Sequence, residues 1–237
     1  MINNKRAIIL AGGKGTRLRP YTLVLPKPLM PIGEFPILEV VIKQLSKNGF
    51  NHITLAVNHQ ASIIKAFFGN GEKWSIKIDY YHEESPLGTM GPLKGIKDLP
   101  ENFLIMNGDV LTNLDFDGFY NKHVERKSIF SISSSKRVQK IDYGVLDLDK
   151  LNYLIGFNEK PEINYEVSMG VYIANKEILG YIPEKFFGFD DLMKLFLKIN
   201  KKVYVENFSG YWLDIGRPSD YEKAIEDFDI ISKDLLK

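Results

Sequence analysis

A short apolar run that opens into a glycine-rich loop restricts the fold of this chain more than any other feature. The run covers residues 7–10, and the next seven residues hold three glycines, a lysine, a threonine and an arginine. Glycines let backbone N–H groups approach a polyanion, and the hydroxyl and the cations can complete its coordination. The pattern predicts a buried strand leading into a phosphate-binding loop; a tight solvated turn is the alternative for so short a motif.

Two familiar phosphate loops do not fit this sequence. A P-loop requires a lysine directly after its last glycine, whereas Lys14 precedes Gly15. A Rossmann dinucleotide fingerprint requires a glycine three residues after its second glycine, and Leu18 stands there. The chain is therefore predicted to be neither a P-loop kinase nor a dehydrogenase.

Composition limits the classes of partner. The net charge of +1 over 237 residues gives no electrostatic case for nucleic-acid or membrane binding. Cysteine is absent, which excludes disulfides and thiolate metal sites. The apolar stretch before Gly12 is too short for the core of a signal peptide, and no later stretch is long enough to span a bilayer. We expect a cytoplasmic protein.

Alternating strand-like and helix-like patterns predict an α/β fold with a doubly wound, Rossmann-like mixed sheet, mostly parallel in its centre, with helices on both faces. The predicted strands cover 7–10, 53–57, 77–81, 103–106, 129–133, 143–148, 153–157, 167–174 and 203–208. The predicted helices cover 36–48, 61–68, 190–199 and 219–231, with a weaker one at 91–99. The closely spaced later strands predict a smaller antiparallel extension that covers the first half. No linker divides the chain, so we predict one domain over 1–237.

Charged residues follow several predicted strands, where ligands bind in open α/β sheets. Lys27 stands between two prolines, which restrict the backbone around a single ammonium group. Asp109 is either a turn residue or a ligand for a hard cation, and Asp214 also ends a short apolar run near a glycine. Two such carboxylates could share one Mg²⁺. Glu159 and Lys160 are either functional or a surface ion pair of little energetic weight.

Seven motifs in order now resemble one family, the sugar-1-phosphate nucleotidyltransferases. They are Leu10-Ala11-Gly12-Gly13-x-Gly15-Thr16-Arg17-Leu18, Pro26-Lys27-Pro28, Pro86-Leu87-Gly88-Thr89, Asn107-Gly108-Asp109, Tyr143-Gly144-Val145, Glu159-Lys160-Pro161 and Trp212-x-Asp214-Ile215-Gly216. The resemblance runs from about residue 6 to residue 221. Segments 84–93 and 212–221 look most like the mannose-1-phosphate guanylyltransferase branch, and heptose-phosphate enzymes are close relatives.

The resemblance implies a reaction between two polyanions. A phosphate oxygen of a hexose or heptose 1-phosphate attacks the α-phosphorus of a nucleoside triphosphate in line, giving a nucleotide-sugar and pyrophosphate. The attacking phosphate has a second pKa of about 6 and is already largely dianionic, so no general base is required. Catalysis then consists mostly of positioning and of charge neutralisation.

The resemblance also implies roles for particular residues. Arg17 and Lys27 are the expected catalytic cations, and Asp109 and Asp214 the expected ligands of Mg²⁺. The implied nucleotide-binding residues are Leu10, Ala11, Gly12, Gly13, Gly15, Thr16, Arg17, Lys27, Glu84, Pro86, Gly88 and Asp109 in a half of about 1–115. The implied sugar-phosphate residues are Gly144, Glu159, Lys160, Ser168 and Trp212 in a half of about 116–237. Trp212 is equally consistent with a core residue.

Several alternatives stay open at this stage. GTP is favoured by resemblance alone, with dTTP, UTP and CTP behind it, because main-chain contacts to a base leave no trace in a sequence. Ser168 stands where relatives often carry asparagine or alanine, so the identity of the sugar is open. A non-catalytic subunit that binds nucleotide-sugars is a hypothesis from another class. A homo-oligomer is also left open.

Overall fold

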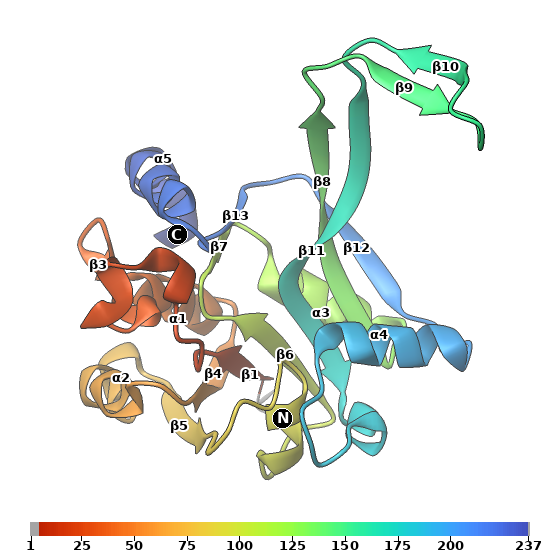
Figure 1. Cartoon of the computed structure of the whole chain (residues 1–237). Coiled ribbons are helices and arrows are strands. Elements are labelled where there is room, and N and C mark those ends of the chain that lie inside the picture. The colour runs from red at the N-terminus through yellow and green to blue at the C-terminus, as the bar shows by residue number, and fades with distance from the viewer. Residues whose placement is uncertain (1–4, 237) are drawn as a thin grey trace.

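The fold is built around one seven-stranded sheet, seen in a computed structural model that describes residues 5–236 (Figure 1). Its strands lie in the order β12 (Tyr204–Phe208), β8 (Phe130–Lys140), β11 (Glu162–Asn175), β6 (Asn102–Asn107), β1 (Lys5–Leu10), β4 (Phe50–Val57) and β5 (Lys77–His82). β1 pairs in parallel with β4 and β6, and β4 with β5. β11 runs antiparallel to both of its neighbours, and β12 is parallel to β8. The predicted mixed sheet with mostly parallel central strands is confirmed.

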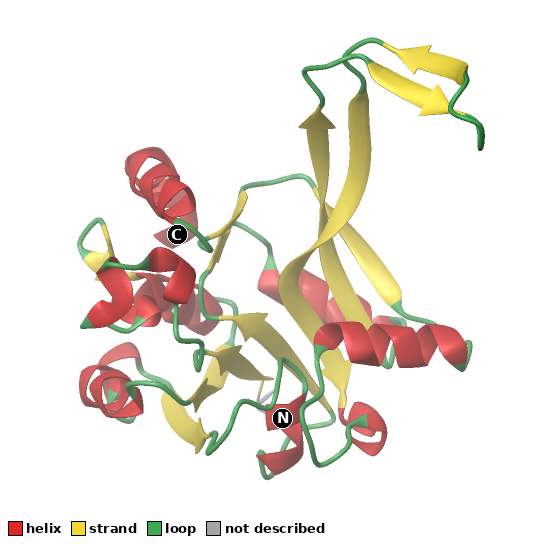
Figure 2. Ribbon diagram, in the orientation of Figure 1, coloured by secondary structure: helices red, strands yellow, loops and turns green. Residues whose placement is uncertain are grey.

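Helices cover both faces of this sheet (Figure 2). They are α1 (Ile37–Lys47), α2 (Ala61–Phe68), α3 (Phe116–Glu125), α4 (Phe189–Lys198) and α5 (Pro218–Leu236). On β1 the alternation of side chains separates two cores: Ala7 and Ile9 pack with α1, α2 and α3, whereas Ile8 packs with α4. α5 lies on α1 in a third cluster. None of the helices in the described range combines the length and the apolar character that crossing a membrane requires.

One helix prediction is wrong, and one helix was not predicted. The stretch predicted as a helix over 91–99 is only a 3-10 helix at Gly91–Gly95, because glycines and Pro92 disfavour a longer helix. α3 was not predicted, since Gly118 in its first turn obscures the pattern; the Asp115 side chain caps this helix by accepting a hydrogen bond from the Gly118 N–H at 2.9 Å. Further 3-10 helices span Thr16–Leu18, Tyr21–Leu23, Lys27–Leu29, Glu72–Trp74 and Lys176–Tyr181.

A small antiparallel sheet joins two distant parts of the chain. β7 (Val110–Thr112) pairs with β13 (Trp212–Asp214), so that Asp214 stands opposite Val110. Another short pair, β2 (Pro31–Ile32) and β3 (Phe35–Pro36), leads into α1. The first of these pairings is what brings the carboxyl-terminal motif to the end of β6.

The antiparallel extension exists, but the expectation that it covers the first half is wrong. β8 and β11 continue past the sheet as a two-stranded ribbon that carries the hairpin of β9 (Val145–Leu148) and β10 (Leu154–Asn158). We call residues 136–166 the arm. Its ladder runs without a break from the Ser134–Ser168 pair to the Lys140–Glu162 pair. This continuous pairing directs the arm away from the body of the molecule (Figure 1).

Candidate active site

The glycine loop leaves β1 in a defined shape. The Ala11 N–H donates to the Ala56 carbonyl of β4 at 2.8 Å, and the Thr22 hydroxyl donates to the Gly15 carbonyl at 2.7 Å. Gly15 has φ +59°, and a Cβ there would lie 2.9 Å from Thr22. Only glycine satisfies both conditions without strain. The loop is thus held at both ends, while Thr16 and Arg17 remain exposed.

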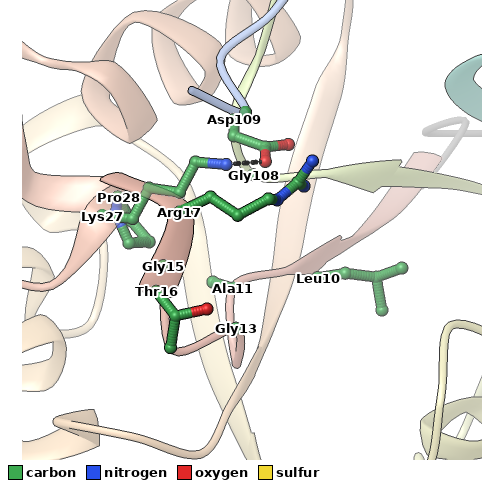
Figure 3. Close-up of a pocket in the computed structure, with 11 residues that line it drawn as sticks. Leu10, Ala11, Gly13, Gly15, Thr16, Arg17, Lys27, Pro28, Gly108 and Asp109 are labelled. Carbon is green, nitrogen blue, oxygen red and sulfur yellow. Dashed lines mark hydrogen bonds and ion pairs between the residues drawn. The ribbon is translucent and has the colours of Figure 1, made fainter. Parts of the chain in front are cut away.

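A pocket of about 260 Å³ opens between this loop and the end of β6 (Figure 3). It is lined by Leu10, Ala11, Gly13, Gly15, Thr16, Arg17, Lys27, Pro28, Gly108, Asp109 and Gly216. Eight of these residues were predicted to bind nucleotide, and the structure brings them together. The pocket therefore places two cations and a carboxylate beside a loop of accessible backbone.

Lys27 forms an ion pair with Asp109 across this pocket (Figure 3). Its backbone is fixed by the 3-10 turn Lys27–Leu29, whose Pro28 and Leu29 are buried. The Lys27 side chain is 12% exposed and that of Asp109 22%, so the pair is shielded from water yet open to a ligand. An ammonium group in this position is held by its surroundings and is unlike a freely rotating surface lysine.

Asp214 is brought next to Asp109 by the pairing of β13 with β7. The Ile215 N–H donates to the Asp109 carbonyl at 3.1 Å. Burial raises the pKa of Asp214, and the negative charge of Asp109 raises it further, while Lys27 and Arg17 act in the opposite direction. Two carboxylates and two cations therefore act on one another in one small volume, although they come from four separate segments.

The two carboxylates fit a divalent cation better than a purely structural ion pair. Asp109 Oδ2 is paired with Lys27, but Asp109 Oδ1 is buried and has no hydrogen-bond partner. Buried carboxylate oxygens are normally satisfied, so a lone one calls for a ligand. Within residues 5–236 no group of three or more metal-ligating side chains gathers. Mg²⁺ needs only one or two carboxylates when phosphate oxygens complete its coordination.

A second pocket of about 420 Å³ adjoins the first and shares Leu10, Gly13 and Asp109 with it. Its other lining residues are Gly12, Lys14, Asn58, Glu83, Pro86, Gly88, Thr89 and Asn107. Gly88 has φ +79°, and a Cβ there would lie 2.7 Å from the Phe187 carbonyl oxygen. Of the residues predicted on this side, Gly12, Pro86 and Gly88 line the pocket.

Glu84 does not line either pocket; its neighbour Glu83 does. Glu84 is exposed, whereas Glu83 accepts a hydrogen bond from the Leu87 N–H at 3.2 Å, and burial raises its pKa. β5 ends at His82, one residue later than the strand predicted at 77–81. Glu83 is thus the first residue after a parallel strand, and this position could have identified it, as it could Asn58 after β4.

Two predicted sugar-site residues lie at the base of the arm. The Ser168 hydroxyl donates to the Tyr172 hydroxyl at 3.0 Å, and the Trp212 indole N–H donates to the Met169 carbonyl at 3.0 Å. The Arg137 guanidinium lies 4.5 Å from the centroid of the Trp212 ring. Burial raises the pKa of Tyr172, and the nearby charge of Asp214 also contributes. This corner therefore adjoins the carboxylates, although neither Ser168 nor Trp212 lines the two pockets described above.

The other three predicted sugar-site residues lie far out on the arm. Gly144 and Glu159 are neighbours there: a Cβ on Gly144 would lie 3.1 Å from Glu159 Oε2. Lys160 follows with φ +43°. All three are exposed, and none lines either pocket. The structure groups them with one another and separates them from the phosphate loop.

Comparison with known proteins places this geometry in a family. The sequence pattern described as "Nucleotidyl transferase" matches residues 6–229. The chain belongs to this family. Its predicted membership among the sugar-1-phosphate nucleotidyltransferases is confirmed, because its relatives carry names of that kind.

Three curated relatives show the range of the family. D-glycero-alpha-D-manno-heptose 1-phosphate guanylyltransferase of Aneurinibacillus thermoaerophilus is 37% identical over 92% of this chain and 96% of its own length. UTP–glucose-1-phosphate uridylyltransferase of Synechocystis is 32% identical over 93% of this chain. The beta catalytic subunit of mannose-1-phosphate guanylyltransferase of Drosophila pseudoobscura is also 32% identical, over 92%. The chain spans about three-fifths of the length of the latter two, 62% and 61%.

A solved structure supports the same assignment. HddC from Yersinia pseudotuberculosis is 29% identical, with a TM-score of 0.74 over 94% of this chain and 99% of that one. The same protein has been solved in complex with GMP-PN, where the TM-score is 0.72. The nucleotidyltransferase fold therefore extends over nearly the whole chain.

Proposed function

We propose that this protein is an enzyme that transfers a guanylyl group from GTP to a mannose-like hexose or heptose 1-phosphate, releasing pyrophosphate. The observation that carries the proposal is the pair of adjoining pockets that meet at Asp109. One pocket gathers cations beside the glycine loop, and the other offers a carboxylate to a base. A triphosphate in the first and a nucleoside in the second would bring the α-phosphate to the carboxylates between them.

The reaction requires charge neutralisation more than proton transfer. An oxygen of the sugar phosphate forms a bond to the α-phosphorus while the bond from that phosphorus to the bridging oxygen of the β-phosphate breaks. The bonding electron pair leaves on pyrophosphate. Arg17 and Lys27 would balance the charge of the departing group; both line the pocket beside the glycine loop, and Lys27 is already held there by Asp109.

We assign Mg²⁺ to Asp109 and Asp214 as its protein ligands. The unpartnered Asp109 Oδ1 and the neighbouring Asp214 carboxyl supply the two oxygens. When bound there, the ion would reduce the repulsion between the α-phosphate and the attacking phosphate. Lys27 holds the other oxygen of Asp109 and so fixes the direction in which Oδ1 points.

Glu83 supports guanine over the other bases on chemical grounds. A carboxylate is acceptor-only, and guanine presents two adjacent donors, N1–H and N2–H, that can meet its two oxygens. Uracil and thymine present one donor between two carbonyl oxygens, and cytosine presents one amino donor beside two acceptors, so neither kind of base offers two adjacent donors to a carboxylate. A Cβ on Gly12 would lie 3.0 Å from Glu83 Oε1, so a larger residue at position 12 would crowd the carboxylate that we assign to the base.

Most of the relatives named above also favour guanine as the base, but they are not unanimous. Two of the three named above are guanylyltransferases and HddC was solved with GMP-PN, whereas the third is a uridylyltransferase. The sugar is supported only by resemblance to the mannose- and heptose-phosphate enzymes. The Glu83 carboxylate is therefore the feature to test first.

The test is pyrophosphate release with Mg²⁺ over four nucleoside triphosphates and mannose, heptose, glucose and amino-sugar 1-phosphates. We expect turnover with GTP and a manno-configured acceptor. Glu83→Gln should lower kcat/KM for GTP by about 10- to 100-fold, in line with about 1–3 kcal/mol for a bidentate base contact, and should narrow the gap to UTP. Glu84→Gln, at the exposed neighbouring residue, is the matched control; it should change neither kcat/KM for GTP nor the preference for GTP over UTP.

A nucleotide-sugar-binding subunit without catalysis is the second hypothesis. It predicts tight nucleotide binding that Asp109→Asn and Asp214→Asn leave unchanged, together with no turnover by the parent protein. Absence of turnover with every substrate pair, from folded protein, would reject the transferase proposal.

A further inference from the structure

The arm carries an apolar surface that no part of residues 5–236 covers. The large apolar residues of its hairpin and adjoining turns that are between 57% and 79% exposed are Tyr143, Leu146, Leu151, Tyr153, Leu154, Ile155 and Phe157. Single exposed apolar residues are ordinary, but a concentration of large ones on one projecting element marks an interaction surface. We therefore expect another protein surface to pack against the arm.

The arm also has open backbone edges. β12 pairs with β8 only as far as Ser135, and β6 pairs with β11 only from Val171, so the ribbon beyond these points has two strands. β9 and β10 likewise form a two-stranded sheet. A two-stranded hairpin is marginally stable in water by itself, and an unpaired edge is a template for another strand. Packing against another protein chain would stabilise the two-stranded arm and would shield its unpaired strand edges.

The length of the ribbon keeps the end of the arm away from its own pockets. Six residue steps separate the Ser134–Ser168 pair from the Lys140–Glu162 pair. At about 3.3 Å a step the ribbon extends about 20 Å beyond the corner that holds Ser168. Glu159 and Lys160 lie beyond that point, so the protomer's own pockets lack the groups expected to hold the sugar phosphate.

The charge of the arm suits an identical partner. Residues 136–166 contain five cations and six anions, a net charge of −1. The pairing of β8 with β11 sets Lys136 opposite Glu166 and Lys140 opposite Glu162, so the two signs lie side by side along the ribbon. Two such arms can approach without strong repulsion, whereas a nucleic acid or an anionic membrane would meet no net positive charge on the arm. A two-fold dimer uses the same surface on both subunits and so covers both arms at once.

We propose that two copies of this chain dimerise through their arms, and that each arm places Glu159 and Lys160 at the sugar-phosphate site of the other subunit. The dimer follows from the apolar, open-edged arm itself. The assignment of Glu159 and Lys160 to the sugar phosphate rests on the proposed function. In this arrangement the pocket of one subunit and the arm of its partner form one complete site.

The interface is tested by sedimentation equilibrium. Wild type should be a dimer, and Ile155→Asp and Phe157→Asp should each shift it to monomer. Ile230→Asp is the matched control, because Ile230 is 81% exposed on α5, away from the arm; it should stay dimeric. Circular dichroism checks that the variants are folded. A monomeric wild type, or arm variants that remain dimeric, would overturn the interface.

The exchange of arms is tested by mixing two inactive variants. Asp109→Asn keeps an intact arm, and Lys160→Ala keeps an intact pocket. If arms act on the partner, co-expression gives half heterodimers with one complete site each, and about a quarter of wild-type activity returns. If each arm serves its own pocket, no activity above that of the separate variants returns, and the exchange is wrong.

A third measurement does not depend on turnover. The chain has no cysteine, so Lys160→Cys and Arg217→Cys can be introduced together on the arm and beside the pocket. A short bismaleimide should link them into a covalent dimer on a denaturing gel; a linked monomer would show that the arm folds onto its own subunit. Absence of turnover in wild type would reject the proposed function, while sedimentation and cross-linking would still decide the interface.

Discussion

Lowering the pH should destabilise this protein through one buried histidine. His123 on α3 is fully buried: its Nδ1 lies 2.7 Å from the Ser131 hydroxyl and its Nε2 lies 3.2 Å from Asn102 Oδ1. Because Asn102 Oδ1 can only accept, we assign the proton of the neutral ring to Nε2, and Nδ1 accepts from Ser131. Protonation would place a second donor and a charge in the core. Burial accordingly lowers the pKa of His123 from 6.5 to about 4.

The magnitude follows from proton linkage. Between these two pKa values the unfolded chain binds a proton that the folded chain does not, so the stabilising contribution is complete above about pH 6.5 and is lost as the pH falls. At pH 5 the loss relative to pH 7.5 is about 2 kcal/mol, from 1.36 kcal/mol per pKa unit. Below about pH 4 it reaches its limit of about 3 kcal/mol.

Urea unfolding at a series of pH values measures this effect. Carboxylates also contribute to acid destabilisation, so the informative quantity is the difference between wild type and His123→Gln, which cannot titrate. His123→Gln should have a lower free energy of unfolding than wild type at pH 7.5, and this difference should be smaller by about 2 kcal/mol at pH 5. His59→Gln, at an exposed position, is the control. If the difference in the free energy of unfolding between wild type and His123→Gln stays constant with pH, His123 is not the source of the effect.

Three further predictions concern the site. Arg17→Met should lower kcat by about 10²–10³ with little change in the urea midpoint, because Arg17 lines the pocket but its side chain is exposed and contributes little to the packed core; a large loss of stability would contradict this. Chelation of divalent cations should abolish pyrophosphate release, and added Mg²⁺ should restore it in wild type but poorly in Asp214→Asn. Gly88→Ala should destabilise the fold by about 1–3 kcal/mol, because φ is +79° and the new Cβ would meet the Phe187 carbonyl oxygen at 2.7 Å. Gly180→Ala, with open space around its position, should be neutral.

Local patterns predicted much of the architecture. The strand at 7–10 and the helices at 36–48 and 61–68 correspond to β1, α1 and α2, because apolar periodicity records which face of each element is buried. The glycine loop and the restricted backbone around Lys27 were also accessible, since glycine and proline act on the backbone locally; the 3-10 helix that Lys27 begins was not predicted. Family membership rested on such local motifs and is confirmed.

Pairing between distant segments was not accessible in the same way. The sequence suggested that Asp109 and Asp214 share an ion, but only the β7–β13 register explains why they meet. Glu84 was implied by the resemblance alone, whereas the observed end of β5 at His82, one residue later than predicted, places Glu83 directly after the strand and beside the pocket. Because side chains alternate along a strand, a shift of one residue changes which side chain faces a pocket.

The direction of the arm shows most clearly which features follow from the sequence and which depend on the tertiary structure. The sequence alone determined that residues 143–148 and 153–157 are strands, because their side chains favour extended backbone; the structure has strands there, at Val145–Leu148 and Leu154–Asn158. Only the tertiary structure decided that the ribbon beneath them continues straight past the sheet. That outcome depends on a ladder between residues far apart in the chain, whose free energy comes from their mutual contact and not from either segment by itself.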